Sequence, residues 1–163
     1  MTRLKQVLVG RNPKRTLIRA AVLAIVSLVV FGYPARPVRV KGISMEPTLH
    51  DGSIHFINRW HYAWSTPQRG DLVAVAMPGG RAFFMKRVLG MPGERIAFVN
   101  GQLLIDGAPY AESYLRDAGD WNMAELAVPE GHYFIAGDNR QTPWSGHTLG
   151  LIHEDQVSGR LLR

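Results

Sequence analysis

The sequence predicts a mostly β protein, with a small antiparallel β-sheet or partly closed barrel preceded by one N-terminal transmembrane helix. Near the N-terminus, a basic tail runs into an apolar segment whose one charged residue is Arg19. After residue 37 the apolar residues form short runs separated by Gly and Pro, without the long 3.6-residue period of a helix. Asn100-Gly101 lies between two such runs and is typical of a tight hairpin turn, because that turn needs positive φ angles.

The apolar segment at residues 17–33 predicts the transmembrane helix. It is at the short end of what crosses a hydrocarbon core of about 30 Å, and Pro34 ends it. Basic residues before it predict a cytoplasmic N-terminus. A cleavable signal peptide, a buried core helix and a transit peptide are the alternatives. The predicted organisation is a basic tail over residues 1–16, an anchor over 17–33 and a folded domain over 34–163.

The positive charge of the chain is concentrated near the N-terminus, in this tail and at Arg19 of the predicted anchor. The formal net charge is +6, which taken alone is typical of a nucleic-acid-binding protein. Residues 1–19, however, hold six of the 19 Lys and Arg and no acidic residue, so 13 basic residues face all 13 Asp and Glu in the rest of the chain. We therefore expect no nucleic-acid partner.

Seven segments predict the strands of the folded domain, because each is a short apolar run bounded by turn residues. They cover residues 38–40, 53–58, 72–77, 82–89, 96–99, 102–105 and 132–136. Residues 111–115 and 122–127 are candidates for single helical turns.

A serine in the stretch KGISMEPTLHDG, residues 41–52, is a candidate nucleophile. Ser44 follows a predicted strand, but a serine attacks an acyl carbon only when a base removes its proton. None of the six His lies in a GxSxG elbow or an HExxH spacing. The chain has no Cys, which excludes disulfides and a thiol nucleophile. We expect neither a metal nor a cofactor.

Lysine is the alternative base. Lys86 falls in the predicted strand at 82–89, where period-two alternation places it on one face with Phe84 and Val88. Burial on such a face disfavours the ammonium and lowers the pKa, as a lysine base requires. A surface lysine whose ammonium reaches solvent is the competing interpretation. Lys41, three residues before Ser44, is the other lysine of the predicted folded domain.

Four segments in order resemble the conserved boxes of type I signal peptidases, the membrane-bound Ser/Lys serine endopeptidases. They are KGISMEPTLHDG, RGDLVAV (69–75), KRVLGMPGE (86–94) and GDNR (137–140). The resemblance implies that Ser44 is the nucleophile, that Lys86 is the general base and that the Ser44 backbone N–H donates to the oxyanion. It also implies a preference for substrates with small residues at positions −1 and −3.

The resemblance further implies the partners and the location of the protein. Its partners would be the signal peptides of preproteins and the lipid bilayer; the oligomeric state is not predicted. The expected location is the bacterial inner membrane, with one span and the catalytic domain on the outer or periplasmic side; the mitochondrial inner membrane is the alternative. A dedicated processing peptidase for a conjugation or pilus precursor, or a catalytically weakened module that binds signal peptides, are the competing functions.

The last box departs from the family pattern. Where the family has Ser, Asp, Ser and Arg, a gapless alignment places Pro143, Ser145, Gly146 and His147. The hydroxyl that orients the lysine and its acidic neighbour are thus absent at the expected positions, and Thr142 or Ser145 are candidate substitutes. Asp138 and Asn139 are expected to fix a turn through side-chain to backbone hydrogen bonds.

Overall fold

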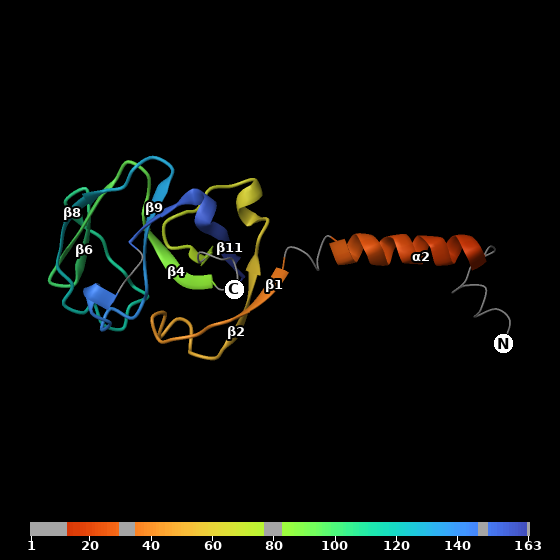
Figure 1. Ribbon diagram of the computed structural model, residues 1–163, viewed down its shortest axis with the longest axis horizontal. Coiled ribbons are helices and arrows are strands. Elements are labelled where there is room, and N and C mark those ends of the chain that lie inside the picture. The colour runs from red at the N-terminus through yellow and green to blue at the C-terminus, as the bar shows by residue number, and fades with distance from the viewer. Residues whose placement is uncertain (1–12, 30–34, 77–82, 147–149, 163) are drawn as a thin grey trace. The chain divides into compact units, whose positions relative to one another are not determined.

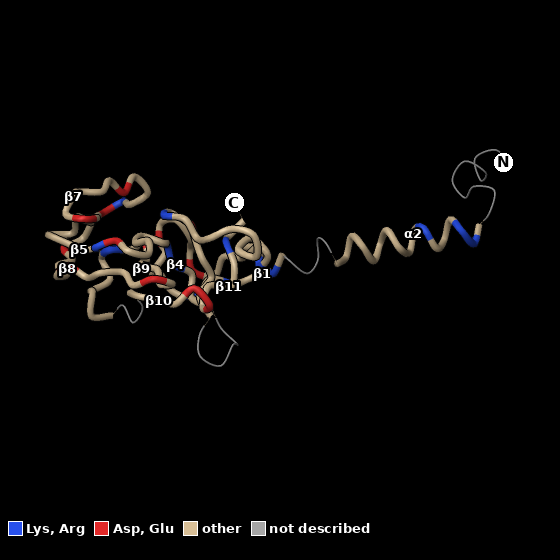
Figure 2. The backbone as a smooth tube through the Cα atoms, turned by 90° about the horizontal axis from the view of Figure 1, so that it is seen from above, with Lys and Arg blue, Asp and Glu red and all other residues tan. Residues whose placement is uncertain are grey.

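The structure is a computed structural model that describes residues 13–29, 35–76, 83–146 and 150–162 (Figure 1). The chain divides into two compact units, Met1–Arg36 and Pro37–Arg163. The first contains α2 (Pro13–Ser27), whose described side chains are not buried. Basic residues and no acidic ones lie on α2, whereas both signs are interspersed over the second unit (Figure 2).

The predicted transmembrane helix is only partly described. The helix begins at Pro13, ahead of the predicted anchor, and residues 30–33 of that anchor lie outside the described residues. In the part of the chain that the structure describes, no helix combines the length and the apolar character needed to cross a membrane.

The larger sheet of the second unit has seven strands in the order β1-β2-β11-β3-β4-β9-β10. Their bounds are β1 (Ala35–Arg39), β2 (Ile54–Asn58), β11 (Val157–Leu161), β3 (Leu72–Ala76), β4 (Phe83–Gly90), β9 (His132–Ala136) and β10 (Leu151–His153). The pairings from β2 to β10 are antiparallel. β4 lies between β3 and β9, so both of its edges are hydrogen-bonded and residues 85–90 are buried.

The smaller sheet has the order β7-β6-β5-β8 and is antiparallel throughout. Its strands are β7 (Ala108–Pro109), β6 (Gln102–Ile105), β5 (Arg95–Val99) and β8 (Met123–Ala127). The hairpin predicted between β5 and β6 is confirmed, because Asn100 and Gly101 adopt φ angles of 49° and 81°. An aromatic core joins the two sheets, with Phe98 of β5 packed against Phe134 of β9 and against Trp121.

The mostly β, antiparallel fold is confirmed, but the partly closed barrel is not. Among the described strands neither sheet closes on itself, since each has two unpaired ends in its strand order. Residues 122–127 do not form a helical turn; they form β8, which pairs with β5. Residues 112–115 form a single hydrogen-bonded turn, in which Leu115 N donates to Glu112 O at 3.1 Å. The strands β7, β10 and β11 lie outside the predicted segments.

The close approach of the two sheets at Gly90 makes a testable prediction. A methyl group there would lie 2.7 Å from Ile96 Cγ1 and 2.8 Å from Phe134 Cβ. We expect Gly90→Ala to lower the free energy of unfolding in urea by about 1–3 kcal/mol, because the core must shift to accept it.

Gly146→Ala is the matched control, since its added Cβ would meet only Thr142 Cγ2 at 3.7 Å, an ordinary contact. Its effect should stay within about 0.5 kcal/mol. Equal stability of the two variants would contradict the close packing at Gly90.

Candidate active site

The side chains of Ser44 and Lys86 meet, although they are 42 residues apart. Lys86 Nζ donates a hydrogen bond to Ser44 Oγ at 3.0 Å. Lys86 lies on β4 and is 7% exposed, while Ser44 is half-buried in the turn between β1 and β2. The amine is therefore carried by a central strand of the larger sheet, and the hydroxyl by the turn that packs against it.

Two core residues hold the turn that carries Ser44. Met45 and Leu49 are 1% and 3% exposed, and Leu49 N donates to Met45 O at 2.9 Å. Before Ser44 the chain turns at Gly42, whose φ of 91° favours glycine and whose amide donates to Asp51 Oδ1 at 2.8 Å. The turn is thus anchored on both sides of the serine.

The segment after β9 packs against the backbone of Ser44. Asn139 N donates to Ser44 O at 3.0 Å, and Asn139 Nδ2 donates to Ile43 O at 3.1 Å. A Cβ at Gly137 would lie 2.2 Å from Ser44 O, so only glycine fits at this contact. Among the described residues, none is shown accepting a hydrogen bond from Ser44 N.

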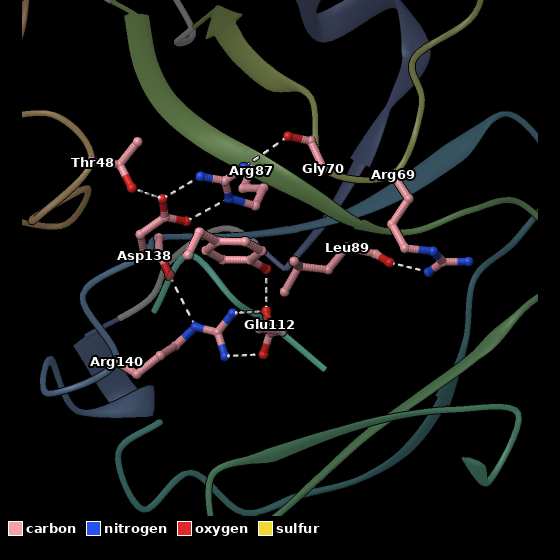
Figure 3. A network of polar contacts seen from close by, with 10 residues as sticks. Thr48, Arg69, Gly70, Arg87, Leu89, Glu112, Asp138 and Arg140 are labelled. Carbon is pink, nitrogen blue, oxygen red and sulfur yellow. Dashed lines mark hydrogen bonds and ion pairs between the residues drawn. The ribbon is translucent and has the colours of Figure 1, made fainter. Parts of the chain in front are cut away.

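Burial lowers the pKa of Lys86, and the carboxylate of Asp138 opposes this by favouring the ammonium. Asp138 is itself neutralised by a buried ion pair, in which Arg87 Nε and Nη2 donate to its two oxygens at 2.8 and 2.6 Å. Thr48 Oγ1 adds a third hydrogen bond at 2.5 Å (Figure 3). With its charge shared in this way, Asp138 counteracts the effect of burial on Lys86 only in part.

Asn139 and Asp138, both expected to fix a turn, make different kinds of hydrogen bond. Asn139 makes side-chain to backbone bonds, as expected, and its Oδ1 also accepts from Gln141 N. The bonds expected from Asp138 to the backbone are replaced by bonds to the side chains of Arg87 and Thr48.

Thr142 and Ser145, the candidate substitutes for the missing hydroxyl, do not contact Lys86 through a hydrogen bond in the described part of the chain. Thr142 uses its carbonyl to accept from Trp121 Nε1 at 2.8 Å, and Ser145 is exposed in the 3-10 helix Trp144–Gly146. Neither hydroxyl is hydrogen-bonded to Lys86 among the described residues. His147 lies outside the described residues.

Sequence reasoning missed Arg87 and Thr48. A signal for Arg87 was present, because a charged residue inside the buried strand 82–89 requires a partner of opposite charge. Thr48 offered no such signal, since its role depends on Asp138 lying beside it in the fold.

A small cavity lies beside Ser44. Its volume is about 20 Å³, room for a group no larger than about one water molecule or methyl. The lining residues are Val40, Lys41, Ser44, Met45, Phe83, Phe84 and Met85. No group of three or more His, Asp or Glu side chains in the described ranges is arranged to hold a metal ion.

A serine hydroxyl within hydrogen-bonding distance of a buried amine is an arrangement suited to acyl transfer. Comparison with known proteins identifies the family of the chain. Residues 14–162 match the family described as "Signal peptidase, peptidase S26". The chain belongs to this family.

Named relatives of this family cover most of the chain. A protein named "Signal peptidase I" from Bacillus licheniformis is 33% identical over 91% of this chain and 88% of its own length. "Signal peptidase I T" from Bacillus subtilis (strain 168) is 34% identical over 86% of this chain and 79% of its own. The crystal structure of a signal peptidase I from Enterococcus faecalis V583 aligns with a TM-score of 0.49 and 29% identity, covering 60% of this chain and 98% of that one.

The buried amine predicts a pH-dependent stability difference. Below its lowered pKa, Lys86 carries a charge that burial disfavours, and this cost disappears as pH rises from that pKa to the ordinary value of 10.5. Lys86→Met should therefore raise the midpoint of thermal unfolding near about pH 7, with a gain that shrinks towards about pH 10.

Lys41→Met is the matched control, because the Lys41 side chain belongs to an exposed residue. It should change the midpoint little at either pH. A Lys86→Met protein that is less stable than the unsubstituted protein at neutral pH would show that the amine is not penalised by burial.

Proposed function

We propose that the chain is a membrane-anchored serine endopeptidase that cleaves signal peptides from exported preproteins with Ser44 as nucleophile and Lys86 as general base. The observation that carries this is the 3.0 Å hydrogen bond between Lys86 Nζ and Ser44 Oγ, made by a lysine whose pKa is lowered by burial. Membership of the signal peptidase family supplies the class of reaction.

The mechanism follows from these two groups. Neutral Lys86 takes the proton of Ser44 as Oγ bonds to the scissile carbonyl carbon. The resulting oxyanion accepts a hydrogen bond from Ser44 N–H. Protonated Lys86 then gives its proton to the leaving amine as the C–N bond breaks, which leaves an acyl-enzyme. Water attacks this ester with Lys86 again acting as base, and Ser44 recovers its proton.

The cavity beside the nucleophile supports a preference for small side chains. Its volume of about 20 Å³ suits the methyl group of alanine, and Met45, Phe83 and Met85 give it apolar walls. A larger side chain next to the scissile bond would have to displace core residues, since Met45 and Met85 are themselves buried.

The proposed anchor is the segment at residues 17–33. In its described part, the side chains of Leu17, Leu23 and Ile25 are 62–70% exposed. Lys14, Arg15 and Arg19 favour a cytoplasmic N-terminus, which would put the peptidase unit on the outer side of a bacterial inner membrane.

The proposal is tested by mapping new N-termini with mass spectrometry after incubation of detergent-solubilised protein with a pool of preproteins. The protein should cut after small-x-small sites. Ser44→Ala and Lys86→Met should each lower the rate at least about a thousandfold, because the nucleophile or its base is lost.

Lys41→Met is the matched control for the base. It removes the other amine near Ser44 but leaves the Lys86–Ser44 hydrogen bond in place. Because Lys41 also lines the cavity beside Ser44, KM can change, but kcat should stay within a few-fold. If Lys41→Met lost activity and Lys86→Met kept it, the base would be Lys41 and the proposed role of Lys86 would be wrong.

The same experiment separates the competing functions. Many preproteins cut would indicate general processing, and a single one cut would indicate a dedicated peptidase. Folded protein that binds signal peptides but cuts none, while a control peptidase cuts the same pool, would replace the proposed enzyme with a binding module.

A further inference from the structure

A second buried ion pair lies next to the candidate site. Arg140 Nη1 and Nη2 donate to the two carboxylate oxygens of Glu112 at 2.9 and 2.5 Å. The side chains are 0% and 4% exposed, and the Arg140 guanidinium also stands over the rings of Phe98 and Trp121 at 5.0–5.3 Å. Glu112 lies in the turn after β7, so the pair connects the smaller sheet to the segment after β9.

Arg140 also binds the backbone of Gly137, which lies against Ser44 and Lys86. Its Nε donates to Gly137 O at 3.0 Å. Figure 3 shows the guanidinium of Arg140 facing the carboxylate of Glu112. Gly137 is the residue whose added Cβ would lie 2.2 Å from Ser44 O and 3.3 Å from Lys86 Nζ. A shift of Gly137 would therefore change the packing against both Ser44 and Lys86.

A second branch runs from the same carboxylate. Tyr114 OH donates to Glu112 Oε1, and burial raises the pKa of Tyr114, which keeps this donor protonated. The Tyr114 ring lies against the guanidinium of Arg87, with 3.7 Å from Arg87 Cζ to the ring centre. Arg87 in turn pairs with Asp138, so Glu112 is linked through Tyr114 to the ion pair that acts on Lys86.

We propose that Glu112 is a positioning residue for the Ser44–Lys86 pair, acting through Arg140 on Gly137 and through Tyr114 on Arg87. This inference rests on the proposed function. The support comes from Glu112 and Tyr114 in the turn after β7, and it reaches the site through Arg140 of the GDNR segment and through Arg87 of β4. A loss of about 1 Å in alignment of reacting groups can lower a rate by about a hundredfold.

The test compares kcat and KM of Glu112→Gln with those of the unsubstituted protein, on a peptide with one small-x-small site. Glutamine keeps the volume but removes the charge that holds Arg140. We expect kcat to fall about 10- to 100-fold with KM within about twofold, because alignment of the dyad is disturbed and the peptide-binding surface is not.

Two further variants separate positioning from folding. Tyr114→Phe removes the hydroxyl from Glu112 but keeps the ring on Arg87, and should lower kcat about two- to tenfold in a protein that unfolds near the original midpoint. Glu125→Gln is the matched control, because Glu125 pairs with Arg95 on the same sheet at an exposed position, and it should leave kcat unchanged.

Each outcome decides the inference. A fall in kcat for both network variants, measured below their unfolding midpoints, supports it. Unchanged kcat in folded Glu112→Gln and Tyr114→Phe overturns it while the proposed function stands, since the unsubstituted protein still cleaves. No cleavage by the unsubstituted protein overturns the proposed function, and the inference with it.

Discussion

The buried ion pair between Arg87 and Asp138 is the interaction on which the candidate site depends. It joins β4, which carries Lys86, to the segment after β9, which packs against Ser44. Thr48 brings the nucleophile turn into the same cluster. Removing either partner would leave an unpaired charge in the interior at a cost of about 3–5 kcal/mol. The three segments that form the site are therefore held by one pair of charges.

This ion pair also sets the electrostatics of the proposed base. A free carboxylate beside Lys86 would favour the ammonium and keep the amine protonated. Because Arg87 and Thr48 take up the oxygens of Asp138, burial remains the dominant influence on the pKa of Lys86. A neutral amine next to Ser44 is the state that the proposed mechanism needs at the start of each cycle.

The larger sheet carries the Ser44–Lys86 site, and the turn after β7 of the smaller sheet contacts the segment beside it. The larger sheet supplies the strand that carries Lys86 and anchors the turn of Ser44 through Met45 and Leu49. The smaller sheet supplies no residue to the Ser44–Lys86 pair, yet the turn after β7 brings Glu112 to Arg140. Rigid support from a distance is what a reaction sensitive to sub-ångström alignment requires.

Local patterns in the sequence were sufficient for the mostly β character, the β5–β6 hairpin and the main strands from β2 to β6 and β9. These features depend on residues close in the chain, such as Asn100-Gly101, a pair that adopts the positive φ angles of a tight hairpin turn more readily than most. The motif around Ser44 and the strand of Lys86 could be recognised for the same reason, since each lies in one short segment.

Only the tertiary structure decided the features that depend on partners far apart in the chain. β8 is a strand because it pairs with β5, and β11 because it lies between β2 and β3; neither segment has a local pattern strong enough to predict this. The same holds for Asp138, expected to bond to the backbone but paired with Arg87 from 51 residues away. Local propensity acts over a few residues, whereas pairing of strands and buried charges is settled only when distant segments are brought together.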